Sequence, residues 1–159
     1  MPSLLIIYHS RTGGTEQMAR AAEEATDCPI LLKPATETTP ADLLAADGYI
    51  FACPENLASM SGVMKDFFDR TYYPVLGKIE GRPYAVMICA GSDGEGAARQ
   101  VARIALGWRL KPVAEPLIIC THAQTAEAIL APKIIPDADL SQCRELGATL
   151  AAGLAMGIF

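Results

Sequence analysis

The segment "SRTGGT" (residues 10–15) contains the residue types that bind an anion. Gly13 and Gly14 permit positive φ and close backbone approach, so successive N–H groups can converge on an anion at a helix start. Further donors come from three hydroxyls, those of Ser10, Thr12 and Thr15. Because each hydrogen bond to a charged group contributes about 1.5–3 kcal/mol, neutral donors in this number can bind a phosphate monoester without a lysine.

This segment differs from two common nucleotide-binding patterns. It lacks the lysine of G-x-x-x-x-G-K-[ST], and its glycines do not follow G-x-G-x-x-G. A P-loop NTPase site and a dinucleotide-binding Rossmann site are therefore not supported. The alternative interpretation is a turn that only caps the next helix. Arg11 could pair with a bound phosphate, or its side chain could point into solvent.

Two further polar loops follow apolar runs, namely "PENLASMSG" (54–62) and "GSDGEG" (91–96). Ligands of open parallel sheets bind beyond the carboxyl ends of the strands, near the point where strand order reverses. We therefore expect the three loops to form one site. Cys53 precedes the second loop and could influence a ligand, but a cysteine at a strand end is more often a small buried apolar residue.

Apolar runs that alternate with helical patterns must position these loops. The runs are residues 4–8, 30–32, 49–53, 84–90 and 117–120. Helices are expected at residues 15–25, 61–73, 95–106 and 139–154, with a short one starting at Thr39, Pro40 and Asp42. This order predicts an α/β doubly wound parallel sheet. Residues 121–139 are long for a connection, which indicates function or extra structure such as a short helix in "TAEAILA".

Composition limits the other possibilities. A chain of 159 residues with 51% hydrophobic and 19% charged residues is expected to form one domain, residues 1–159. The net charge of -5 argues against nucleic acid as a partner. No apolar stretch approaches a membrane span and no basic leader precedes "LLIIY", so we expect a cytoplasmic protein. Five cysteines without a C-x-x-C pair predict neither disulfides nor a metal site.

Two motifs carry a resemblance to a known family. "SRTGGTEQMA" resembles the phosphate loop of flavodoxin-like FMN proteins. "GYIFACPENLASMSGVMKDFFDRTY" resembles the third strand, flavin loop and helix of their NAD(P)H-dependent branch, the multimeric flavodoxin-like FMN and quinone reductases. The likeness covers most of residues 3–106 and, more weakly, the last helix. It implies a three-layer α/β/α sandwich, a five-stranded parallel sheet of order 2-1-3-4-5 and noncovalent FMN.

The resemblance also implies the cofactor-binding positions. The phosphate would contact Ser10, Arg11, Thr12, Gly13, Gly14 and Thr15. The flavin ring would lie on Pro54, Glu55, Asn56, Leu57, Ala58, Ser59, Met60, Ser61 and Gly62, and on Ala90, Gly91, Ser92, Asp93, Gly94 and Gly96. Glu55 and Glu95 could contact a ribityl hydroxyl or a nicotinamide ribose, although a carboxylate at a helix start is also favoured by the helix dipole. No catalytic residue is identified.

The ring loops contain no Trp, Tyr or Phe, whereas flavodoxin electron carriers typically enclose the flavin between aromatic side chains. An open flavin face suits stacking of NAD(P)H and then hydride transfer to a quinone, a flavin or a similar small acceptor. The alternative is a flavodoxin-type electron carrier for redox partner proteins. A second subunit could also supply an aromatic lid from Tyr72, Tyr73 or Trp108, and a homodimer or higher oligomer is expected by family analogy.

The residues at the strand ends include both histidines of the chain. His9 and His122 follow strands that are not neighbours in the expected order, so each is interpreted as a hydrogen-bonded structural histidine. A receiver-like signalling module of the same strand order needs acidic residues at the strand ends. This chain has His9-Ser10 and Cys53-Pro54 at those positions, which argues against such a module.

Overall fold

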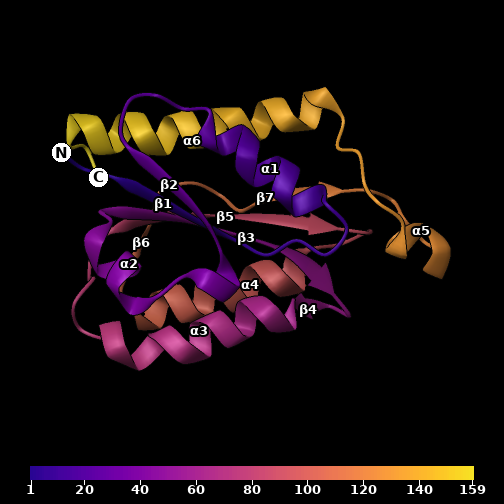
Figure 1. The fold of residues 1–159 in the computed structure, drawn as a ribbon, viewed down its shortest axis with the longest axis horizontal. Coiled ribbons are helices and arrows are strands. Elements are labelled where there is room, and N and C mark those ends of the chain that lie inside the picture. Colours follow the sequence, from indigo (N-terminus) through magenta and orange to yellow (C-terminus); the bar gives the residue numbers. More distant parts are fainter.

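A single sheet forms the middle layer of the protein, and the computed structural model describes all residues from 1 to 159 (Figure 1). Its main strands are β1 (Leu4–Tyr8), β2 (Ile30–Pro34), β3 (Gly48–Asn56), β5 (Pro83–Ala90), β6 (Lys111–Pro112) and β7 (Leu117–Cys120). They pair in the order β2-β1-β3-β5, and β6 and β7 share the next position. All these pairs are parallel, so the carboxyl ends of the strands lie at one edge of the sheet.

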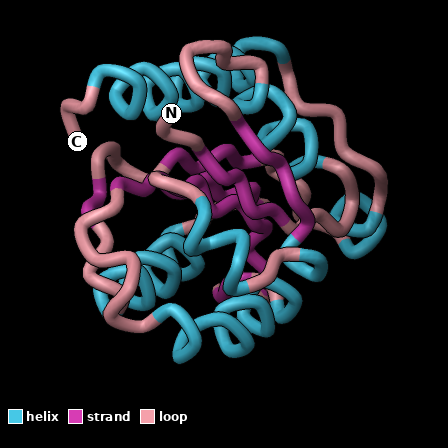
Figure 2. Tube along the Cα trace, turned by 60° about the vertical axis from the view of Figure 1, so that its left-hand side comes forward, coloured by secondary structure: helices cyan, strands magenta, loops and turns pink.

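Helices cover both faces of the sheet (Figures 1 and 2). Their bounds are α1 (Gly14–Glu23), α2 (Pro40–Ala45), α3 (Gly62–Val75), α4 (Glu95–Gly107), α5 (Ala126–Leu130) and α6 (Asp137–Met156), with a 3-10 turn at Ala35–Glu37. Helices α1 and α6 pack on one face, and α2, α3 and α4 pack on the other. Helix α5 lies beyond the carboxyl ends of the strands, opposite the two chain termini. None of these helices combines the length and the apolar character that crossing a membrane requires.

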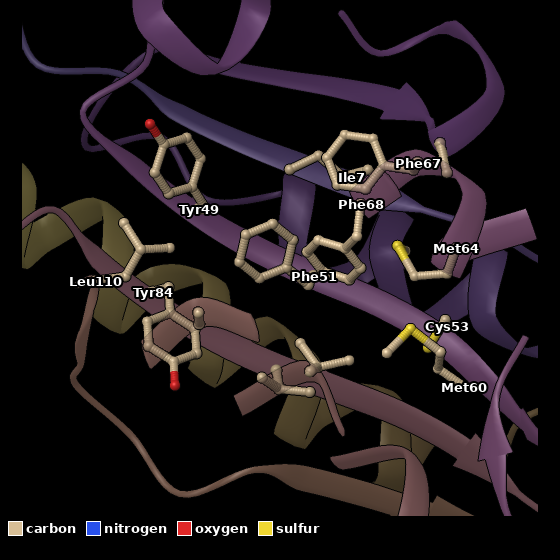
Figure 3. Close-up of a cluster of buried hydrophobic side chains, with 14 of the residues drawn as sticks. Ile7, Tyr49, Phe51, Cys53, Met60, Met64, Phe67, Phe68, Tyr84 and Leu110 are labelled. Carbon is tan, nitrogen blue, oxygen red and sulfur yellow. The ribbon is translucent and has the colours of Figure 1, made fainter. Parts of the chain in front are cut away.

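The two faces of the sheet pack against different kinds of side chain. Toward α3 and α4, the ring of Phe51 lies 5.3 Å from that of Phe68 (Figure 3). The ring of Trp108 lies 6.4 Å from that of Phe51 on the same face. Toward α1 and α6, the core is built mainly from aliphatic and small residues such as Ile6 and Ala22. Because both faces are covered, every residue of β1 and β5 is buried, which explains their continuous apolar sequence.

The predicted α/β fold and strand order are confirmed, with two additions. The fifth position is split between β6, whose pairing with β5 ends at Pro112, and β7, whose pairing with β5 begins at Leu117. A short strand β4 (Ser59–Met60) pairs antiparallel with the end of β3. The predicted start of the second helix is confirmed by a capping box between Thr39 and Asp42. The helix predicted in "TAEAILA" is α5.

We expect Gly147→Ala to lower the free energy of unfolding by about 1–3 kcal/mol, because overpacking at a tight contact forces backbones apart. A Cβ at Gly147 in α6 would lie 2.7 Å from Cα of Ala22 in α1. Gly62→Ala is the control, since a Cβ there would meet no atom within 4 Å. Urea unfolding of both variants checks this, and equal stability of the two would contradict the close α1–α6 contact.

Candidate functional site

A cavity of about 370 Å³ lies beyond the carboxyl ends of the strands. It is lined by parts of all three predicted loops, namely Arg11 and Thr12, Pro54, Glu55, Asn56, Leu57 and Ala58, and Ala90, Gly91 and Ser92. Other lining residues are Cys89, Thr121, Ala123, Gln124, Ile129 and Lys133. The loops therefore converge as the sequence predicts, and the segment after β7 adds one further wall.

The first loop ends in a set of unpaired backbone donors. Gly13 is the N-cap of α1 with φ of 93°, and its N–H donates to Oγ of Ser10 at 3.1 Å. No side chain caps the helix, and the N–H groups of residues 10–12 and 14–16 donate to no atom of the chain. Since unpaired amides at a helix N-terminus bind anions, this arrangement fits a phosphate group.

Gly14 and Thr15 have packing roles beside this set of donors. A Cβ at Gly14 would lie 2.8 Å from Sγ of Cys89, so only glycine lets α1 start this close to β5. Thr15 is 2% exposed. Burial raises the pKa of the Cys89 thiol to about 11, so this thiol is protonated at neutral pH although it lines the cavity.

Lys133 is a part of the site that the sequence analysis missed. Its backbone N–H donates to the carbonyl oxygen of Thr12 at 2.8 Å, and its Nζ lies 3.4 Å from Oγ1 of Thr12. Gln17 connects the same two segments, because its Nε2 donates to the carbonyl oxygens of Gly13 and Lys133. The only sequence signal was the unusual length of residues 121–139.

The second loop is a tight hairpin between β3 and β4. Leu57 and Ala58 form its turn with φ of 53° and 64°, values that residues with a Cβ rarely adopt. Helix α4 holds the turn in place. Oε1 of Gln100 accepts from the N–H of Met60 at 2.8 Å, and a Cβ at Gly96 would overlap the carbonyl oxygen of Ala58. Leu57 is fully exposed at the rim of the cavity.

Glu55 joins this hairpin to the third loop. Its carboxylate accepts from the N–H of Gly94 at 2.8 Å and from the N–H of Ala97 at 3.3 Å, so it caps α4. Glu95, in the first turn of α4, forms no side-chain hydrogen bond or ion pair, which agrees with the helix-dipole interpretation. The Glu55 carboxylate therefore fixes the wall of the cavity.

His9 has the structural environment that the sequence predicts. Its Nδ1 lies 2.8 Å from Oγ of Ser61, which is 1% exposed and accepts from the N–H of Met64 as the N-cap of α3. Burial, together with the charge of Arg11, lowers the pKa of His9. His122 is separate from this pair, and its N–H donates to the carbonyl oxygen of Gly91.

Several predicted residues lie outside the cavity. Cys53 packs in the core beside Met60 and Met64 (Figure 3), and burial raises its pKa to about 12. Ser59, Met60 and Gly96 line a second groove along α4, whereas Ser61 and Gly62 begin α3. Gly94 is the N-cap of α4, and the N–H of Glu95 donates to Oδ1 of Asp93.

The aromatic residues considered for a lid do not reach the cavity within this chain. Trp108 is fully buried, and its Nε1 donates to the carbonyl oxygen of Tyr72 at 3.0 Å. The ring of Tyr72 stacks on that of Trp108. No aromatic side chain lines the cavity.

Comparison with known proteins gives consistent matches. The family described as NADPH-dependent FMN reductase matches residues 7–124. A flavodoxin of Aquifex aeolicus is 35% identical over 108 residues, 64% of this chain and 56% of that protein. An NAD(P)H dehydrogenase (quinone) of Acidithiobacillus ferrooxidans is 33% identical over 95 residues, 45% of this chain and 48% of that protein. The chain thus spans about half the length of these two relatives.

A solved structure confirms the fold. A flavodoxin from the domain Archaea superposes with a TM-score of 0.76 at 18% identity, covering 96% of this chain and 98% of that one. At this level of identity the likeness concerns the fold alone. It confirms the flavodoxin-like arrangement that the two motifs predicted.

We expect Glu55→Ala to lower the free energy of unfolding by about 0.5–2 kcal/mol, because two N-terminal amides of α4 lose their acceptor. Glu55→Gln keeps an acceptor oxygen and should cost less. Glu95→Ala removes a carboxylate from the same turn without breaking a hydrogen bond. Thermal unfolding separates the variants, and an equal loss for Glu95→Ala would show that only the helix dipole matters.

The lowered pKa of His9 makes stability depend on pH. Between its lowered folded pKa and about 6.5, the unfolded chain binds a proton that the folded protein does not. The contribution of His9 to the free energy of unfolding should therefore fall as pH drops below about 6.5 and level off below the folded pKa of His9. His9→Gln, which cannot titrate, should lose less stability over this range in urea unfolding. Equal losses would exclude His9 as the source.

Proposed function

We propose that this chain, which belongs to the family of NADPH-dependent FMN reductases, binds FMN in the cavity. We further propose that it transfers hydride from NAD(P)H to a small acceptor. The acceptor class is a quinone, a free flavin or a similar molecule. FMN, the cofactor predicted from the sequence, is also the one that the family description names.

The unpaired amides at the start of α1 carry this proposal. A phosphate dianion there would accept hydrogen bonds from the N–H groups of residues 10–12 and 14–16, none of which has a partner within the chain. The hydroxyl of Thr12, which lines the cavity, would add a donor. The arrangement supports a phosphate monoester that enters from the cavity side.

The other two loops are suited to the ring of the cofactor. The N–H groups of Gly91, Ser92 and Asp93 also donate to no atom of the chain, so they are proposed donors for the oxygen-bearing edge of the flavin. Residues 54–58 of the hairpin form another wall of the cavity. When bound, FMN supplies the hydride chemistry. The chain then binds and orients it, and we propose residues 10–15, 54–62 and 90–96 as its binding positions.

The absence of an aromatic cover supports a reductase. A cavity without Trp, Tyr or Phe leaves a flat face free for a nicotinamide and then for an acceptor. The side chain of Leu57 at the rim, which is fully exposed, offers an apolar contact to such a ring.

We also propose that residues 1–159 form one domain, because a single sheet lies between both core clusters.

An electron carrier is the second candidate. The 35% identity to a flavodoxin of Aquifex aeolicus favours it. In this case the protein would exchange electrons with a redox partner protein, and a nicotinamide would not reduce it directly. The two candidates share the cofactor and differ in the electron donor.

An anaerobic titration tests the proposal. Purified protein loaded with FMN is mixed with NADPH or NADH, and the flavin absorption is followed over time. We expect either nucleotide to bleach the flavin at a rate that supports turnover, and a soluble quinone to restore the colour. A chemical reductant that bleaches the flavin where both nucleotides fail would favour the carrier. Failure of the protein to quench FMN fluorescence would exclude both.

A further inference from the structure

We propose that Lys133 is the cation that binds the phosphate of the flavin mononucleotide, brought to the neutral loop 10–15 by the segment that follows β7. The inference rests on the proposed function, since it assumes that a flavin phosphate occupies the start of α1. Lys133 is at least 118 positions away in sequence from the loop 10–15 to which it would add a positive charge.

The backbone of Lys133 is fixed to the loop by hydrogen bonds on both sides. Its N–H donates to the carbonyl oxygen of Thr12 at 2.8 Å, and its carbonyl oxygen accepts from Nε2 of Gln17 at 2.8 Å. Oε1 of Gln17 in turn accepts from the N–H of Ile135 at 3.0 Å. The lysine is thus held in position by the chain before its side chain is considered.

The ammonium group has one donor to spare. Nζ donates to the carbonyl oxygens of Ile129 at 2.8 Å and of Ala131 at 2.6 Å. A lysine has three N–H donors, and the third reaches only Oγ1 of Thr12 at the long distance of 3.4 Å. Because Lys133 and Thr12 both line the cavity, this donor is available to a phosphate oxygen there.

Arg11 is the other cation of this loop, and its side chain is less firmly positioned than that of Lys133. Its side chain is exposed and forms no hydrogen bond or ion pair, so solvent screens its charge. Lys133 is half-buried and fixed. Glu16, the acidic residue in the first turn of α1, is engaged with Tyr8 and Arg20, and no carboxylate forms an ion pair with Lys133.

The same ammonium also ties α5 to the cavity. Helix α5 has five residues and none of them is buried, so little apolar packing holds it. The two carbonyl oxygens that Nζ contacts lie at its C-terminal end, and Ile129 from this helix lines the cavity. Lys133 therefore links the phosphate position to the wall that α5 provides.

Fluorescence titrations with FMN and with riboflavin test the role of Lys133, because the two flavins differ only in the phosphate. Wild type, Lys133→Met, Lys133→Arg and Lys78→Met are compared. Lys133→Met should weaken FMN binding about tenfold or more relative to riboflavin binding, so that the FMN-to-riboflavin affinity ratio falls by that factor. Lys133→Arg should keep most of the preference for FMN. Lys78, an exposed lysine before β5, is the charge control and should leave both affinities unchanged.

The outcomes separate the two proposals. If wild type binds neither flavin, the proposed function is overturned together with this inference. If wild type binds FMN and Lys133→Met keeps the same FMN-to-riboflavin ratio, only the role of Lys133 is overturned. An equal loss of both flavins in Lys133→Met would also overturn it, because that pattern reports a loosened α5 segment rather than a lost phosphate contact.

Discussion

The parallel pairing of β1 with β3, and of β3 with β5, is the constraint on which the candidate site depends. It brings the carboxyl ends of the strands to one edge, so that the loops at residues 10–15, 54–62 and 91–96 line one cavity although they are distant in sequence. Each loop is then fixed by a contact between elements. Glu55 joins the hairpin to α4, and Gln17 joins the first loop to the segment after β7. The cavity is therefore shaped by the sheet and held by a few polar side chains.

The distribution of aromatic residues follows from the same arrangement. Phe51, Phe68 and Trp108 fill the space between the sheet and the helices α3 and α4. No aromatic residue stands where β3 and β5 reach the cavity. The rings that stabilise the fold are therefore not available to cover a bound flavin from within this chain. The same placement of aromatic residues therefore gives a well-packed core and a cavity without an aromatic cover.

The elements and the main loops could be predicted because their signals are local. The run at residues 4–8 and the caps at Thr39 and Asp42 matched the structure closely. The hairpin at Leu57 and Ala58 could not be predicted, because such turns usually contain Asn or Gly and this one is held by α4. Lys133 was missed because only the folded chain places it beside Thr12. Whether each predicted binding residue contacts a cofactor stays a prediction.

The hairpin turn combines an unfavourable backbone conformation with an exposed apolar side chain at the cavity rim. Positive φ at two residues with a Cβ costs about 1–2 kcal/mol each, a cost that glycine would avoid. Glycine at position 57 would also remove the exposed apolar side chain from the cavity rim. Contacts to Gln100 and Gly96 offset the cost and hold the turn. The strained turn lies beside the cavity rather than in the core. This location agrees with a turn whose conformation places the Leu57 side chain where it can contact a ligand.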